Sequence, residues 1–185
     1  MIIINDENTF IYLESNWEDI NIIQRYRDSC IPAGIEWLME FHNISHPSLS
    51  TLQKKFQNGT CFGEIKEYLL EIIPRIRIEI FSDNLSADTR FNKIKELIVK
   101  NIPCLFSLVI PKIQKCHIMP VIGVSSESIK TKDYTLCLND KIIKETKIEE
   151  YSFDYLRTLH EKYRRIGNDI LWINQISNYS EKEAL

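Results

Sequence analysis

Apolar residues recur at helical spacing through the first half of the chain, whereas the second half carries short alternating or continuous apolar runs. In residues 30–43 the apolar positions recur every three or four residues, which predicts an amphipathic helix that begins at about Cys30. Asp28 and Ser29 are good N-cap residues, and Pro32 is tolerated in a first helical turn. The pattern therefore places Cys30 where a loop becomes a helix.

The same periodicities divide the rest of the chain into helices followed by strands. Further helices are expected at 50–57, 63–73, 86–101 and 152–165. Strands are expected at 75–81, 103–110, 117–125, 133–140 and 169–174, after an N-terminal hairpin over Met1–Leu13. The polar stretch 126–132 is interpreted as the turn that joins two of these strands, and Pro120 predicts an edge position or a bulge. Helices and strands do not alternate, so we predict an α+β fold with a mostly antiparallel sheet.

Composition and charge exclude some classes of protein but give no functional motif. The chain has 185 residues and a net charge of −3, which suits a single domain over residues 1–185 and gives no basic surface for nucleic acid. It has no apolar run long enough for a membrane helix and no signal-peptide pattern at its start, so we expect a soluble, cytoplasmic protein. Five cysteines without a C-x-x-C motif favour reduced thiols.

Cys30 is the first candidate for chemistry, because the N-terminus of a helix stabilises a thiolate. Of the four histidines, His117 is the best candidate for its base, since it opens an apolar strand and can face a cleft. His42 and His46 lie about 18 Å or more away at the far end of the same helix, and His160 lies on a polar helix.

Two further residues complete a candidate site. If the strands 117–125 and 133–140 form an antiparallel hairpin, the end of the second strand returns beside His117. Asn139 or Asp140 would then orient the imidazole. The side-chain amide of Gln24, six residues before Cys30, is a candidate donor to an oxyanion, together with the backbone N–H of Cys30.

The order Gln24, Cys30, His117 and Asp140 resembles that of papain-like cysteine peptidases, above all the bacteriocin-processing (double-glycine) peptidase group in a stand-alone form. The segment DSCIPAGIEWLM keeps the family's spacing of cysteine, proline and alanine. KNIPCLFSLVI, HIMPVIGV and LCLND are similar to the family's later strand segments. The similarity extends from Gln24 to Asp140.

The resemblance implies a papain-like fold in which the nucleophile helix packs against an antiparallel sheet. It implies a cysteine protease, or a related amide-bond acyl-transfer enzyme, that acts on a protein or peptide without a metal or organic cofactor. Cys30 would be the nucleophile, His117 the base and Asp140 the third member of the triad, with Asn139 beside it. Gln24 would support the oxyanion hole.

Two alternatives remain open at this point. Ile31 stands where the family has glycine, and Pro120 interrupts the histidine strand, so a catalytically inactive papain-like fold could serve as a protein-binding module. A metal site built on Cys116, His117 and Cys137 is the other alternative, although adjacent strand residues point to opposite faces.

Overall fold

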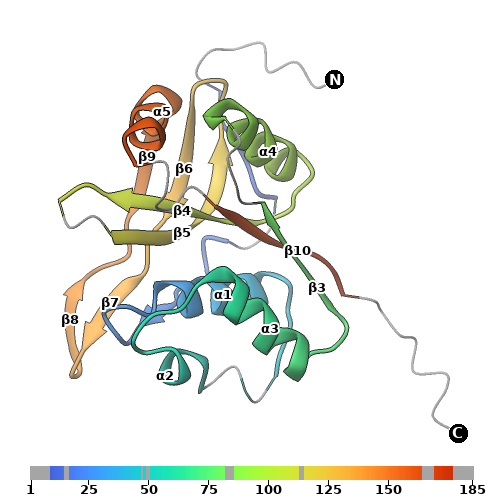
Figure 1. The fold of residues 1–185 in the computed structure, drawn as a ribbon, viewed down its shortest axis with the longest axis vertical. Coiled ribbons are helices and arrows are strands. Elements are labelled where there is room, and N and C mark those ends of the chain that lie inside the picture. Colours follow the sequence, from blue (N-terminus) through green and yellow to red (C-terminus); the bar gives the residue numbers. More distant parts are fainter. Residues whose placement is uncertain are drawn as a thin grey trace, which may run out of the picture.

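The structure, a computed structural model, describes residues 9–14, 17–46, 48, 51–81, 86–112, 115–163 and 169–176. These residues form a mixed α+β fold (Figure 1). The helices are α1 (Cys30–Phe41), α2 (Leu52–Lys55), α3 (Phe62–Ile72), α4 (Ala87–Val99) and α5 (Phe153–Lys162). The strands are β1 (Ile11–Tyr12), β2 (Ile23–Gln24), β3 (Ile76–Phe81), β4 (Cys104–Ile110), β5 (Lys115–Val124), β6 (Ser128–Lys132), β7 (Thr135–Leu138), β8 (Lys141–Lys144), β9 (Ile148–Ser152) and β10 (Ile170–Ile176).

The strands are arranged in two sheets. The larger is antiparallel, with the order β3-β10-β4-β5-β6-β9, and β1 also pairs with β5. The smaller has the order β2-β7-β8, and its β2–β7 pair is parallel. Helices α1, α2 and α3 lie on one side of the β4–β5 pair, and α4 and α5 lie on the other side (Figure 1). The predicted α+β class is confirmed.

Helix α1 packs closely on the centre of the larger sheet. Its buried face includes Trp37 and Leu38, and it contacts β4 and β5. A Cβ atom added at Gly34 would lie 2.8 Å from the Leu105 side chain and 2.8 Å from the Tyr134 hydroxyl. Glycine therefore lets this helix approach β4 closely. The strand β4 is buried over nearly its whole length, as its continuous apolar run predicts.

Most predicted elements are present with ends that differ by a few residues, but the predicted hairpin of 117–125 with 133–140 is wrong. The segment taken as its turn contains β6, and β6 is the strand that pairs with β5. Strand β7 instead pairs with β2 and β8. Strand β6 is difficult to recognise from its polar sequence, although its Ile129 and Thr131 are fully buried.

Two other expectations concern strand β5 and its partners. Of the predicted N-terminal hairpin, residues 1–8 lie outside the described residues, and β1 pairs with Gly123 and Val124 of β5. The expectation for Pro120 is confirmed, because pairing of β5 with β6 begins only at Val121 and its register shifts before Gly123.

None of the helices in the described part of the chain is long and apolar enough to cross a membrane.

Candidate active site

Cys30 is the first residue of α1, and the loop that leads to it is fixed from within. The buried hydroxyl of Ser29 donates to the Tyr26 carbonyl (2.9 Å) and lies 3.1 Å from Gln53 Oε1, so it does not cap the helix. The N–H of Cys30 has no carbonyl partner within the helix. The N-terminal N–H groups and the positive end of the helix dipole are thus presented beside the thiol.

His117 lies on a part of β5 that has a strand partner on one side. His117 pairs with Leu108 of β4 on one side of β5, whereas β6 joins the other side only from Val121 onward. Asp133 directly follows the last residue of β6, which runs antiparallel to β5 and so returns toward its start. The Asp133 carboxylate lies on the side of His117 that β6 does not reach, and its Oδ1 atom is 2.6 Å from His117 Nε2.

The Asp133 carboxylate is buried and fully engaged. Its side chain is 3% exposed, Oδ1 also accepts the backbone N–H of Tyr134 (2.8 Å), and Oδ2 forms an ion pair with Lys144. Burial alone would raise the pKa of Asp133, but the hydrogen bond and charge of His117 and the ion pair with Lys144 outweigh it and lower the pKa to about 2. Asp133 is therefore an anion at neutral pH.

His117 links this anion to the thiol. Because Nε2 faces Asp133, Nδ1 is the nitrogen left for the Cys30 thiol, which is close enough to hydrogen-bond with the ring. Burial lowers the pKa of His117, but hydrogen bonds and charges from Asp133 and Cys30 outweigh this effect and raise the pKa to about 9. The site thus favours an imidazolium held beside the Asp133 anion.

The pair opens into a cleft of about 580 Å³. Apolar side chains of Ile31, Ile110 and Ile118 line it, together with the polar loop 58–60. An ion pair connects its two walls, with 3.1 Å between Lys115 Nζ at the start of β5 and Asp28 Oδ1 in the loop before Cys30. The cleft therefore gives a substrate access to both Cys30 and His117.

The structure brings Cys30 and His117 together as predicted, but it places Asp140 elsewhere. Asp140 is exposed in the turn between β7 and β8, with a φ of 60°, and Asn139 precedes it with a φ of 49°. The expected position of Asp140 or Asn139 beside His117 is wrong, because β7 is not the strand that returns along β5. Asp133, at the other end of that predicted strand, occupies the position instead.

Gln24 is buried but does not present a free amide to the cleft. It lies in β2, opposite Leu136 of β7, and its side-chain N–H groups donate to the carbonyls of Tyr26 (2.8 Å) and Arg27 (2.9 Å). The amide therefore braces the loop before Cys30. In this arrangement the N-terminal N–H groups of α1 are the donors available to an oxyanion.

Gln53, which the sequence analysis did not identify, holds the same loop from α2. Its Oε1 atom accepts the backbone N–H of Arg25 (2.7 Å), and its Nε2 atom donates to the Ile23 carbonyl (2.9 Å) and to Glu36 of α1 (2.8 Å). A glutamine in an amphipathic helix carries no sequence signal for this role, since its partners come from distant segments.

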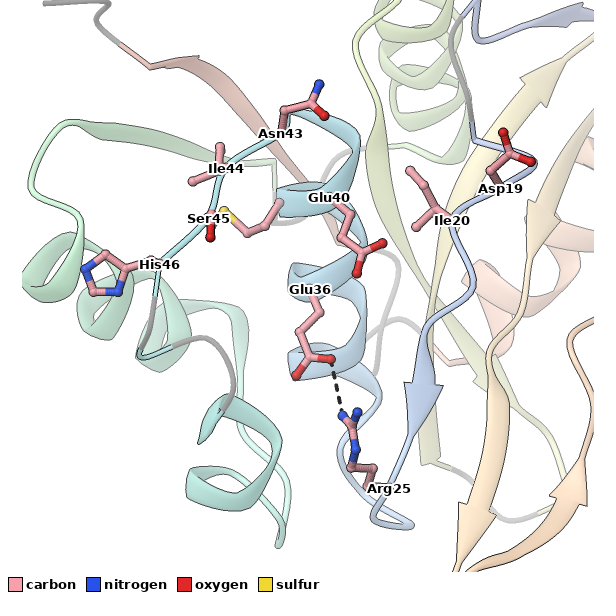
Figure 2. A pocket seen from close by; sticks show the side chains of 10 residues that line it. Asp19, Ile20, Arg25, Glu36, Glu40, Asn43, Ile44, Ser45 and His46 are labelled. Carbon is pink, nitrogen blue, oxygen red and sulfur yellow. Dashed lines mark ion pairs between the residues drawn. The ribbon is translucent and has the colours of Figure 1, made fainter.

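A second pocket, of about 680 Å³, lies along α1 and the loop that follows it (Figure 2). Glu36 and Arg25 form an ion pair in it, with 3.7 Å between the charged atoms. Its histidine, His46, accepts the backbone N–H of Ser48 (3.3 Å) and is not paired with a cysteine in this lining. The larger pocket therefore lacks the thiol–imidazole pair of the smaller one.

A metal site is not formed by the residues that the structure describes, since they contain no group of three potential ligands. The alternative built on Cys116, His117 and Cys137 is thus wrong as a geometric arrangement.

Comparison of the chain with protein-family models and with curated protein sequences found no match.

Proposed function

We propose that this chain is a cysteine peptidase, or a related amide-bond acyl-transfer enzyme, with a Cys30–His117–Asp133 triad. The observation that carries the proposal is the arrangement around His117. One ring nitrogen bonds a buried aspartate at 2.6 Å, and the ring also lies beside the thiol of a cysteine at the N-terminus of a helix. A nucleophile, a base and a group that orients the base are the parts that thiol acyl transfer requires.

The proposed reaction begins when the Cys30 proton passes to His117 Nδ1. The thiolate attacks the substrate carbonyl carbon, and the oxyanion is held by the N-terminal N–H groups of α1, including that of Cys30. The C–N bond breaks as His117 gives its proton to the leaving amine, which leaves a thioester on Cys30. Water, deprotonated by His117, then attacks the thioester and releases the carboxylic acid and the free thiol.

The architecture is consistent with the papain-like resemblance. The cysteine begins a buried helix, and that helix packs against the antiparallel sheet that carries the histidine. We infer that Asp133 takes the role expected of Asp140, and that Gln24 shapes the loop before Cys30 instead of donating to the oxyanion. A protein or peptide substrate suits an open cleft with an apolar wall and a polar loop.

The competing proposal is a non-catalytic protein-binding module on the same fold. Ile31, which lines the cleft directly after Cys30, favours it, because the family that the chain resembles has glycine there. Such a module has no need of a reactive thiol, so the two proposals differ in the reactivity of Cys30.

We expect iodoacetamide at about pH 6 to alkylate Cys30 at least about 10-fold faster than Cys61 or Cys116, as read by peptide mass spectrometry. Cys61 is exposed and accepts the N–H of Glu64 at the start of α3, so it reports on access without a histidine partner. Cys116 lines the same cleft, and burial raises its pKa. Alkylation of Cys61 ahead of Cys30 would favour the binding module.

A further inference from the structure

Lys144 lies outside the triad but contacts it directly. Its ammonium group forms an ion pair with Oδ2 of Asp133, the oxygen that does not bond His117. We propose that Lys144 is a positioning residue, which holds the Asp133 carboxylate as an anion in the orientation that keeps Oδ1 on His117 Nε2. Its importance for catalysis rests on the proposed function, whereas its effect on Asp133 does not.

The two oxygens of Asp133 have separate partners. Oδ1 accepts from the His117 ring and from the Tyr134 backbone N–H, and Oδ2 faces Lys144. A carboxylate fixed at both oxygens cannot rotate without breaking a charged contact. A continuous series of charged contacts thus runs from Lys144, at the end of β8, through Asp133 to His117.

The smaller sheet delivers Lys144 to this position. Lys144 is the last residue of β8 and pairs with Leu136 of β7. The segment that follows is anchored to the start of β7, because the hydroxyls of Thr135 and Thr146 are 2.8 Å apart. The backbone N–H of Asp133 also donates to the Lys147 carbonyl (2.8 Å). The backbone therefore fixes the distance that the lysine side chain has to span.

Other titratable groups surround Asp133, but they do not replace this contact. Those that line its pocket or interact with its charge are His117, Tyr134, Lys144, Lys147, Glu149, Tyr151 and Tyr155. The ammonium of Lys147 is bound by Glu149, whose carboxylate also accepts from the Tyr151 hydroxyl. Lys144 and His117 are thus the cationic side chains that touch Asp133.

Removing the Lys144 charge leaves a buried carboxylate with His117 as its remaining ionic partner. Burial favours the neutral acid, so the pKa of Asp133 rises when the ammonium is lost. Protonated Asp133 no longer stabilises the imidazolium. The acidic limit of Cys30 reactivity then moves to higher pH.

The test uses the full chain and compares Lys144→Met with Lys141→Met. Lys141 is the first residue of the same strand and is exposed, so its replacement removes an equal charge near the turn of the hairpin. We expect the carboxyl ¹³C signal of Asp133 to stay constant between about pH 3 and 6 in the wild type and in Lys141→Met, and to titrate in this range in Lys144→Met. Lys144→Arg should restore the wild-type behaviour.

An unchanged Asp133 signal in folded Lys144→Met protein would overturn the proposal, as would an equal shift in Lys141→Met. Lys144→Gln carries the same expectation if the methionine variant does not fold. The carboxyl signal requires neither a substrate nor a reactive thiol. A Cys30 that alkylates like an ordinary thiol would therefore refute the proposed function while the role of Lys144 is still decided.

Discussion

Replacing Asp133 with alanine should lower the rate of Cys30 alkylation at about pH 6 by about 10- to 1,000-fold. The substitution removes the buried anion that lies 2.6 Å from His117 Nε2 and that raises the pKa of His117. With that anion gone, burial and the nearby Lys144 charge both disfavour the imidazolium, so the thiolate at Cys30 loses its counterion. Turnover of a peptide substrate should fall as well, because the ring also loses the group that orients it.

Asp140→Asn is the matched control for this change. It removes a carboxylate charge from the same predicted strand and keeps a side chain that tolerates the positive φ of the β7–β8 turn. We expect wild-type alkylation in this variant and, since the site is exposed, a free energy of unfolding within about 0.5 kcal/mol of the wild type. The assignment of Asp133 fails if Asp140→Asn slows alkylation while Asp133→Ala does not.

His117→Ala should slow alkylation of Cys30 at about pH 6 on the order of 100-fold, since only about 0.3% of a thiol with a pKa of about 8.5 is ionised there. In the proposed pair the imidazolium is the counterion of the Cys30 thiolate, and the variant lacks it. The difference between the variant and the wild type should shrink as the pH approaches the pKa of an ordinary thiol. Rates measured across about pH 4 to 9 test both features.

The corresponding control is His46→Ala, which removes a histidine from the loop after α1 and from the larger pocket. Its partner is the backbone N–H of Ser48, so the Cys30 environment is unaffected. A profile that is the same in His117→Ala and the wild type would mean that no thiolate–imidazolium pair exists.

The shifted pKa values also define a range of pH in which the His117–Asp133 pair stabilises the fold. The pKa of His117 is raised from 6.5 to about 9, so its contribution is complete below about 6.5 and is lost as the pH rises through about 9. The pKa of Asp133 is lowered from 3.8 to about 2, so its contribution is complete above about 3.8 and is lost as the pH falls toward 2. The two contributions overlap between about pH 3.8 and 6.5, where His117 and Asp133 are both charged.

Strong hydrophobic periodicity makes the elements that carry Cys30 and His117 predictable. The apolar spacing of residues 30–43 predicts α1, and the continuous run after Pro103 predicts β4, because these elements bury one face or their whole length. Cys30 and His117 were therefore placed on the correct elements. Their proximity follows from the packing of α1 on the sheet.

The sequence does not identify the carboxylate partner of His117, because one polar strand conceals it. An antiparallel strand does return a polar residue to His117, but that strand is β6 and not β7. The sequence of β6, SIKTK, has a single aliphatic residue, so its alternation is easily taken for a turn. The alternation of Ile129 and Thr131 with lysines was the signal that could have identified Asp133.

Other parts of the site depend on contacts that local sequence does not encode. The donors of Gln24 are taken by loop carbonyls two and three residues ahead, which depends on the exact path of that loop. Lys144 and Gln53 reach their partners through strand register and helix packing. Periodicity places a residue on an element, but it does not give the side-chain partners across the fold.

The most direct test of the thiolate–imidazolium pair is an NMR titration of the His117 ring, before and after Cys30 is capped with iodoacetamide. We predict a protonated ring at about pH 7.5, with a titration midpoint of about 9. Capping removes the thiolate charge and its hydrogen bond, so the midpoint should then fall. A ring that is neutral at about pH 7.5, or a midpoint that does not change on capping, would contradict the proposed active site.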